Sequence, residues 1–538
     1  MIKIATTALL LLALMTTSLQ PPRVYGKDLP FGDIGSSYAR EAIIRLYEKG
    51  LMNGTTSTRF SPTEPISRAE FAVILQRLLG LEPVDSPIPA YEDVPGGAWY
   101  YEGVQASTEV GLTAGKGPRR FAPAEPVSRQ ETAVWLSRIL NTAIAIDSVS
   151  PTAGKYKDDA AIAVWARPQV YAVSKLGLMN GNGGNFFPEQ ALTRQEIAAV
   201  MDRLLQNPAW AAKLSSPAWP TVQIGWQYGQ TDAQFKQSVL NSNINVLSPR
   251  WFLLAEDGSV SIQSQPSLVA WAKQQGKQVW PLFGNRFDQA TTHALLTSTT
   301  KSSEVITRIT NTAVQTGVQG INLDFENVAP KDREAFTSFV AELARRLHVS
   351  NIVLSLDLSP DFQTDWTEAY DYAALGKIAD YIVMMGYDEH WSGGSAGSVA
   401  SLPWLEKGLD NLLQEVPSSK VILALPLFTR DWMMDGGAGT SAPSEDLNLP
   451  QQFQRIKRFG AKPVWNDKLG QYVADYRSSG AQRRIWLEET RSLTSKYSLA
   501  MSKDIAGFAF WHIGGETPEI WPALRNAAKY DAIVGPGN

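Results

Sequence analysis

Asn322, Asp324 and Glu326 stand at alternate positions in a short, otherwise apolar segment that begins at Gly320. Successive side chains of a β-strand point to opposite faces, so a strand here places all three polar side chains on one face. The two carboxyl groups would then lie roughly 6–7 Å apart, and their repulsion, with partial burial, keeps one of them protonated. The pattern predicts a catalytic strand that presents Glu326 to a substrate as a general acid. The alternative is a solvated edge strand.

Apolar segments typical of strands alternate with helical segments over about the last 320 residues. This alternation predicts a (β/α)8 TIM barrel. The predicted strands are Val222–Trp226, Ile244–Ser248, Gln278–Phe283, Gly320–Glu326, Ile352–Leu358, Tyr381–Tyr387, Val421–Leu427 and Gly507–Trp511. A doubly wound open sheet is the alternative, but no glycine-rich phosphate loop follows the first strand.

Catalytic residues of such barrels gather where the strands end. Met385, Tyr387 and Asp388 stand at the end of the sixth predicted strand, and Trp511 ends the eighth. About eighty residues separate the seventh and eighth strands, far more than one helix needs. We therefore predict a small α+β insertion over about residues 428–500, which forms one wall of a cleft above the barrel.

The N-terminus has a lysine, Lys3, before a short apolar run from Ala5 to Met15, and small residues near Gly26. These features predict a signal peptide over residues 1–26 and a secreted protein. A buried N-terminal helix is the alternative.

A sequence motif then recurs three times at a spacing of about sixty residues. Each copy has an aromatic residue two positions before an aspartate, a Gly-x-x-x-Gly turn, and a Ser/Thr-Arg-x-Glu box. The boxes begin at Ser67, Ser128 and Thr193. In each box the hydroxyl caps a helix and the glutamate reaches back to the cap. We predict helical repeats over residues 27–86, 87–150 and 151–207, followed by a short semi-rigid connector over residues 208–220.

Capping does not require the arginine of each box, which is Arg68, Arg129 or Arg194. A guanidinium beside the free N–H groups of a helix start forms an anion site, so these arginines are candidates for holding a carboxylate.

The three repeats resemble the S-layer homology domain over roughly residues 29 to 210. The resemblance implies an all-α, pseudo-threefold module that anchors exported proteins to pyruvylated secondary cell-wall polymers. It also implies polymer binding by the three arginines and by Trp99 and Trp165, with Tyr38 in the place of the tryptophan in the first copy. Localisation at the cell wall or S-layer surface of a bacterium follows from the same resemblance.

The C-terminal region, residues 221–535, resembles glycoside hydrolase family 18. The motif Asp-x-x-Asp-x-Asp-x-Glu of that family reads Gln319, Asn322, Asp324 and Glu326 here, and its Met-x-Tyr-Asp motif is intact. Asn327-Val328-Ala329-Pro330 looks most like the branch of spore-cortex and peptidoglycan N-acetylglucosaminidases.

The resemblance implies a retaining, substrate-assisted cleavage of β-1,4 bonds at N-acetylglucosamine, in peptidoglycan or in chitin-type oligomers. Glu326 is then the acid, Asp324 orients the acetamide, Tyr387 binds its carbonyl, and Asp388 completes the catalytic set. Asn322, Met385, Trp511 and Trp391 are expected to contact the sugar. Asn322 in place of aspartate removes a negative charge beside Asp324, so proton sharing along the strand is expected to be weaker.

Composition limits the other classes of function. The 538 residues carry a net charge of −4, which offers no basic surface for nucleic acid. Cysteine is absent and the four histidines lack metal-ligand spacing, so we expect neither a metal site nor a cofactor. Two further hypotheses remain: a sugar-binding barrel without turnover, and an S-layer structural protein in which the barrel is a spacer.

Overall fold

The computed structural model describes residues 29–140, 155–215, 221–434 and 442–535. The predicted signal peptide lies outside the described residues. The chain divides into two compact units. One contains the described residues up to Glu64 together with Thr193–Asp202, and the other contains Pro65–Leu192 and the described residues from Arg203 onward.

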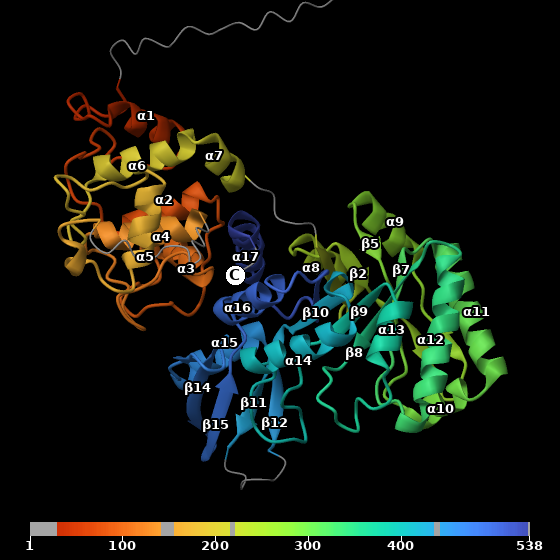
Figure 1. The fold of residues 1–538 in the computed structure, drawn as a ribbon. Coiled ribbons are helices and arrows are strands. Elements are labelled where there is room, and N and C mark those ends of the chain that lie inside the picture. The colour runs from red at the N-terminus through yellow and green to blue at the C-terminus, as the bar shows by residue number, and fades with distance from the viewer. Residues whose placement is uncertain (1–28, 141–154, 216–220, 435–441, 536–538) are drawn as a thin grey trace, which may run out of the picture. The chain divides into compact units, whose positions relative to one another are not determined.

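The N-terminal repeats are helical, as predicted (Figure 1). Their helices are α1 (Arg40–Glu48), α2 (Arg68–Leu78), α3 (Tyr101–Glu109), α4 (Arg129–Leu140), α5 (Arg167–Lys175) and α6 (Arg194–Gln206), with a short 3-10 turn η1 (Asp159–Ala161). The predicted capping boxes form at the starts of α2, α4 and α6. At α4, for example, the Glu131 carboxylate accepts from the Ser128 amide at 2.9 Å, and the Ser128 hydroxyl accepts from the Glu131 amide at 3.3 Å.

The aspartate of each repeat holds a loop in place. Asp93 accepts from the amides of Phe121 and Ala122, both at 2.7 Å, and Asp33 and Asp158 make the same pair of bonds in their own repeats. The second amide in each pair belongs to a residue with positive φ, and in this repeat it is Ala122 at 62°. The repeated motif therefore encodes a loop structure as well as a helix start.

Helix α7 (Pro208–Leu214) occupies the first half of the predicted connector. The Asn207 side chain caps it by accepting from the amides of Ala209 and Trp210, and proline is well suited to the first turn. The boundaries of the three repeats and of the connector remain predictions.

The C-terminal region contains a curled parallel sheet, as predicted for a TIM barrel (Figure 1). Its parallel strands are β1 (Val222–Trp226), β2 (Val246–Ser248), β3 (Arg250–Leu254), β5 (Gln278–Val279), β6 (Leu282–Gly284), β7 (Gly320–Asp324), β8 (Val353–Leu358), β9 (Tyr381–Met385), β10 (Val421–Pro426) and β16 (Gly507–Trp511). β5 pairs with β2 near one end of the strand order, and β6 pairs with β7 near the other end. Because β5 and β6 belong to one continuous segment, this segment connects the two sides of the sheet.

Several details differ from the strand prediction, which also lacked β3. The third predicted strand is divided into β5 and β6 around Pro281, because proline has no N–H to donate to the ladder. Strand β7 ends at Asp324, so Glu326 lies just beyond the strand rather than in it. The additional strand β4 (Val260–Ile262) pairs antiparallel with β3 at the margin of the sheet.

Helices pack around the strands and bury a large apolar core between the two layers. They are α8 (Asp232–Leu240), α9 (Pro266–Gln274), α10 (Gln289–Leu296), α11 (Thr299–Thr316), α12 (Arg333–His348), α13 (Tyr372–Ile378), α14 (Leu402–Glu415), α16 (Thr490–Met501) and α17 (Ile520–Val534), with 3-10 turns η2 (Pro330–Asp332) and η3 (Ser418–Lys420). A second, smaller apolar cluster, which includes Ile224, Val383 and Ala509, comes from barrel strands.

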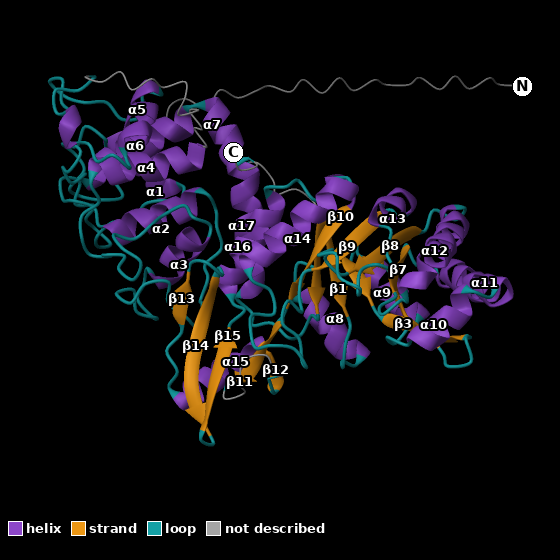
Figure 2. Ribbon diagram, turned by 60° about the horizontal axis from the view of Figure 1, so that its bottom comes forward, coloured by secondary structure: helices purple, strands orange, loops and turns teal. Residues whose placement is uncertain are grey.

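The predicted insertion is present between β10 and β16 (Figure 2). Its antiparallel sheet consists of β11 (Phe428–Met433), β12 (Ser444–Asn448), β13 (Val464–Asn466), β14 (Gln471–Ser478) and β15 (Ala481–Trp486), with helix α15 (Leu449–Phe459) between β12 and β13. The strand order is β12-β11-β15-β14-β13.

Candidate active site and wall-binding groove

A cavity of about 510 Å³ lies at the carboxyl-terminal ends of the barrel strands. Its lining includes six of the residues that the sequence predicted for the active site: Asp324, Glu326, Met385, Tyr387, Asp388 and Trp511. These residues come from the ends of β7, β9 and β16, which are distant in sequence. The position agrees with the general rule that catalytic groups of such barrels lie where the strands end.

The backbone that carries Glu326 is held from both sides. The Asn285 side chain accepts from the Glu326 amide at 3.1 Å and donates to the Glu326 carbonyl at 2.6 Å. The Tyr370 hydroxyl donates to the carbonyl of Phe325 at 2.9 Å. Asn285 is almost fully buried after β6, so the neighbouring strand fixes the position of the carboxyl group.

Burial raises the pKa of Glu326 well above its usual range, and the carboxylates of Asp324, Asp357 and Asp388 raise it further. Burial also raises the pKa of Asp324 to about 6, against the opposing charge of Arg250. A raised pKa favours the protonated form of Glu326, the form that can give a proton to a leaving group.

Asn322 does not reach the cavity. It is fully buried, its Oδ1 accepts from Trp226 Nε1 at 2.7 Å and Ser248 Oγ at 3.2 Å, and its Nδ2 donates to Ser355 Oγ at 3.1 Å and Asp357 Oδ1 at 2.7 Å. Both ends of the amide are engaged, so Asn322 supports the residues that line the cavity and does not itself line it, in contrast to the sugar contact expected from the sequence.

Asp357 lines the cavity and was missed by the sequence reasoning, as was Ser355 beneath it. A signal for both was present, because Ser355 and Asp357 are polar residues at alternate positions in an otherwise apolar strand, the same pattern that revealed Asp324.

Asp388 is contacted by an arginine of the insertion. Its Oδ1 accepts from Arg430 Nη2 at 3.2 Å, and Arg430, on β11, also pairs with Asp446 on β12. Burial raises the pKa of Asp388, and Arg430 opposes this shift. Burial likewise raises the pKa of Tyr387, which therefore keeps its proton and can donate a hydrogen bond.

Aromatic rings form part of the cavity wall. The ring of Trp511 lies 5.8 Å from that of Trp226 and 5.4 Å from that of Tyr228, measured between centroids. Tyr228 and Phe287 also line the cavity and keep about half of their surface exposed, although no sequence pattern pointed to them. Trp391 is exposed but is not among the lining residues, and its role in sugar stacking remains a prediction.

The arginines of the three capping boxes bind backbone carbonyls. Arg68 donates to Phe121 O at 2.7 Å and Ala114 O at 2.6 Å, and its guanidinium also pairs with Glu131. Arg129 contacts Phe186 O and Asn180 O, and Arg194 contacts Phe60 O and Asn53 O, in the same way. Each arginine therefore ties its helix start to a loop of another repeat, in addition to any role in anion binding.

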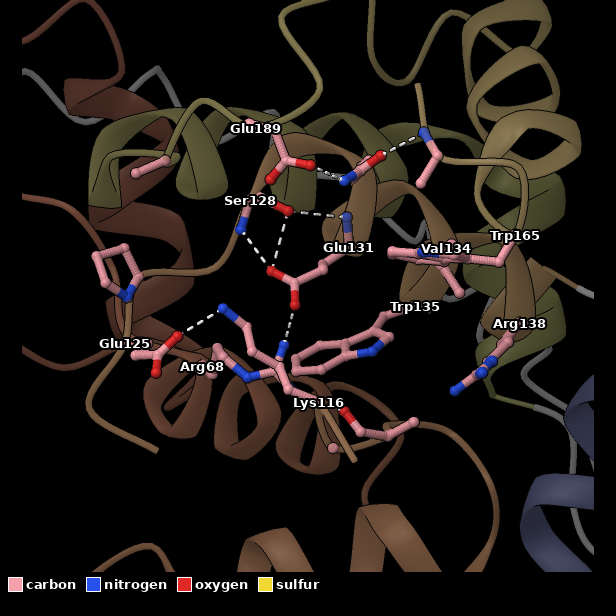
Figure 3. A pocket seen from close by; sticks show the side chains of 16 residues that line it. Arg68, Lys116, Glu125, Ser128, Glu131, Val134, Trp135, Arg138, Trp165 and Glu189 are labelled. Atoms are coloured by element: carbon pink, nitrogen blue, oxygen red, sulfur yellow. Dashed lines mark hydrogen bonds and ion pairs between the residues drawn. The ribbon is translucent and has the colours of Figure 1, made fainter. Parts of the chain in front are cut away.

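A second cavity, of about 750 Å³, lies beside Arg68 (Figure 3). Figure 3 shows Arg68 and Glu131 joined within it, and the rings of Trp135 and Trp165 along its wall. Lys116 and Arg138 add positive charge to the lining, whereas Glu189 and Glu125, which pairs with Lys116 at 2.6 Å, add negative charge. Trp165 is 58% exposed, and Trp99, its counterpart in the second repeat, is 67% exposed, so both rings are accessible to a ligand.

Among the described residues, no group of His, Asp and Glu side chains is arranged to hold a metal ion. None of the described helices combines the length and the apolar composition that crossing a membrane demands.

A barrel that presents a glutamic acid of raised pKa and a second carboxyl group in an aromatic-lined cleft is typical of the glycoside hydrolases. The family model "Glycosyl hydrolases family 18" matches residues 227–516, and the chain belongs to this family. The "S-layer homology domain" model matches residues 30–72, 90–133 and 155–198, so three such domains precede the hydrolase domain.

Curated relatives match this part of the chain. The "Uncharacterized glycosylase YvbX" of Bacillus subtilis (strain 168) is 27% identical over 345 residues, which cover 62% of this chain and 96% of that protein. The "Cortical fragment-lytic enzyme" of Bacillus cereus is 28% identical over 296 residues, which cover 53% of this chain and 68% of that protein.

Solved structures share the fold. The spore cortex-lytic enzyme SleL of Bacillus cereus matches with a TM-score of 0.53 and 25% identity, covering 58% of this chain and 75% of that one. A chitinase of Chromobacterium violaceum matches with a TM-score of 0.52 and 23% identity, covering 57% of this chain and 98% of that one.

Proposed function

We propose that this protein cleaves β-1,4 bonds at N-acetylglucosamine residues of peptidoglycan or a related glycan while the S-layer homology domains hold it on the cell wall. The observation that carries the proposal is the pairing of Glu326, whose pKa is raised, with Asp324 in one cleft beside Tyr387 and Trp511. The similarity to cortex-lytic enzymes favours peptidoglycan over chitin, and the S-layer homology domains favour it independently.

The proposed reaction retains the β configuration and uses the acetamide group of the substrate as nucleophile. Glu326 gives its proton to the glycosidic oxygen as the bond from this oxygen to C1 breaks, and the acetamide oxygen bonds to C1. Asp324 holds the acetamide N–H and Tyr387 donates to its oxygen, which stabilises the oxazolinium ion. Glu326, now ionised, takes a proton from water as the water oxygen attacks C1 and reopens the ring.

The test is analysis of reducing ends by mass spectrometry after the full chain is incubated with purified peptidoglycan or with chitin oligomers. We expect products that end in N-acetylglucosamine, and a fall in kcat of about 100- to 10,000-fold in Glu326→Gln. Glu334→Gln, at an exposed position of α12, is the matched control and should cleave normally. Binding without cleavage by the unmodified chain would favour a sugar-binding barrel instead.

For anchoring, we propose that the groove beside Arg68 receives an acidic sugar of the wall polymer, with Trp165 as a stacking surface and Lys116 and Arg138 as cationic partners. Trp99 and the arginines Arg129 and Arg194 are proposed to act in the same way in the related repeats. Sedimentation with wall fragments tests this proposal: Trp165→Ala should reduce the bound fraction, whereas stripping the polymer from the wall should abolish binding. Equal binding by Trp165→Ala would contradict the assignment of this ring.

A further inference from the structure

A chain of buried polar contacts crosses the barrel beneath the catalytic carboxylates. Trp226 Nε1 can only donate, and it points at one end of the Asn322 amide, so that end must be the oxygen. The other end is then the NH2 group, and it donates to Asp357 Oδ1 at 2.7 Å. Asn322 can therefore neither take up nor release a proton, and the ionisable group at the end of this contact is Asp357.

Asp357 lies next to Asp324 on the same face of the barrel. The register of β7 and β8 pairs Asn322 with Ser355 and Leu323 with Leu356, and the next step places Asp324 beside Asp357. Neighbouring strands are about 4.8 Å apart, and residues in register point to the same side. Both carboxyl groups line the same cavity, and Asp357 is only 3% exposed.

Two carboxylates so placed and so poorly solvated do not both ionise readily. Among the described residues, the hydrogen bond from Asn322 stabilises a charge on Asp357, and Asp324 Oδ1 is buried with no hydrogen-bond partner. A single proton held between the two groups would give that atom a partner and remove the repulsion.

We propose that Asp357 is a positioning residue that shares one proton with Asp324, and so supplies from β8 the carboxyl group that Asn322 lacks on β7. The inference rests on the proposed function for its kinetic consequence, namely that Asp324 holds the substrate acetamide in the orientation that attack on C1 requires. The weaker proton sharing expected from Asn322 is thereby restored from the adjacent strand.

Other charged groups surround the pair and must enter its titration. The charged groups are Glu326 after β7, Asp388 after β9, Arg250 on β3, Arg430 on β11 and Asp446 on β12, and the titratable side chains of Tyr228 after β1, Tyr387 after β9 and His512 after β16 also line the cavity. Burial and the charge of Asp324 raise the pKa of Asp357, whereas the bond from Asn322 opposes the shift. Loss of either partner should therefore allow the other to ionise at lower pH.

The kinetic test compares the full-length chain with Asp357→Asn, which keeps the size of the side chain and its ability to accept from Asn322. We expect kcat to fall about 10- to 100-fold with KM within about twofold, and the acidic limb of the pH profile to move to lower pH. The exchange variant Asn322→Asp/Asp357→Asn returns a carboxyl group to β7 and should recover part of kcat. Asp365→Asn, exposed in the loop after β8, is the matched control. An unchanged kcat and pH profile in Asp357→Asn would overturn the proposal.

A second test does not depend on turnover. In a Glu326→Gln background, which removes the proton of the catalytic acid, the infrared spectrum at neutral pH should lose one protonated carboxyl band on addition of either Asp357→Asn or Asp324→Asn. The loss is measured in the difference between spectra with and without the second substitution, in which the bands of other buried carboxyl groups, such as Glu488 and Glu109, cancel. A band that survives Asp324→Asn would show that the proton belongs to Asp357 alone and would overturn the sharing. Absence of cleavage by the unmodified chain would refute the proposed function, while this spectrum would still decide the inference.

Discussion

Glu326 owes its raised pKa first to burial and then to three neighbouring carboxylates. One of them, Asp388, lies outside strand β9 and is partly compensated by Arg430 from the insertion. The acid therefore responds to charges on separate elements, and changing one of these charges should shift the pH range of catalysis without removing the acid.

We predict that Asp388→Asn lowers the pKa of Glu326, because the variant removes a negative charge that favours the protonated form. Since Glu326 must be protonated to act, the alkaline limb of the profile of kcat/KM against pH should move down by about one pH unit. The measurement is this profile on a soluble oligomer, with Asp365→Asn as the control. An alkaline limb that stays in place would show that Asp388 does not influence the acid.

At the scale of elements, short polar contacts hold both the repeats and the insertion. In the repeats, an aspartate binds two consecutive amides of a loop, and the loop glycine leaves no room for a side chain. A Cβ atom at Gly115, for example, would lie 2.4 Å from the carbonyl oxygen of Arg120. These contacts explain the recurrence of the aspartate and of the glycine along the sequence.

We expect Asp93→Ala to lower the free energy of unfolding by about 2 kcal/mol, because the amides of Phe121 and Ala122 lose a charged acceptor. Urea unfolding followed by circular dichroism measures this change. Glu92→Ala is the matched control, because the Glu92 side chain is exposed and its ion pair with Arg119 lies at the surface. Equal losses in the two variants would contradict the structural role of Asp93.

A buried ion pair joins α16 to the insertion. Lys496 and Glu488 are both fully buried, and Glu488 also accepts from Gln471 Nε2 at 2.7 Å and Ser492 Oγ at 3.0 Å. Burial raises the pKa of Glu488 to about 7, although Lys496 opposes the shift. The carboxyl group therefore depends on its partner for charge compensation.

Lys496→Met should lower the free energy of unfolding by about 3 kcal/mol at pH 8 and by less at pH 5. The sign follows from the raised pKa of Glu488. At pH 5 folded Glu488 is protonated and carries no charge that Lys496 must compensate. At pH 8 the carboxyl group is ionised in the unfolded state, so folding without Lys496 must either bury this charge or bind a proton, and both cost free energy. Urea unfolding at the two pH values measures the difference. Lys496→Met/Glu488→Gln should recover most of the loss at pH 8, and an equal loss at both pH values would contradict the explanation.

At the scale of the whole molecule, three S-layer homology domains and a hydrolase domain share one chain. A tethered enzyme acts on its polymer at an effective concentration set by the tether rather than by the bulk solution. The proposed anchoring should therefore raise the rate on intact wall and leave the rate on a free oligomer unchanged.

We predict that the full chain digests wall fragments that carry their secondary polymer faster, at limiting enzyme, than fragments stripped of that polymer. The excess should disappear when soluble polymer competes for the repeats. Release of reducing ends over time measures both rates, with a soluble oligomer as the reference substrate. Equal rates on the two wall preparations would mean that anchoring does not assist catalysis.

The sequence alone was sufficient for the repeats, for most of the barrel strands and for the placement of Glu326 at a strand end, because each depends on local patterns. Capping boxes and alternating polarity are signals within a few residues, and both families have short motifs. The first and last predicted strands match β1 and β16 residue for residue, and the long interval before Gly507 correctly indicated an inserted sheet.

Only the tertiary structure decided which polar groups meet. Asn322 and Asp357 are 35 residues apart, and they come into contact because β7 and β8 pair in parallel with one particular register. The sequence showed a missing charge at Asn322, whereas the fold places a carboxyl group beside it from the next strand. Local patterns carry no information on register between strands, so the chemistry that depends on that register could be read only from the folded chain.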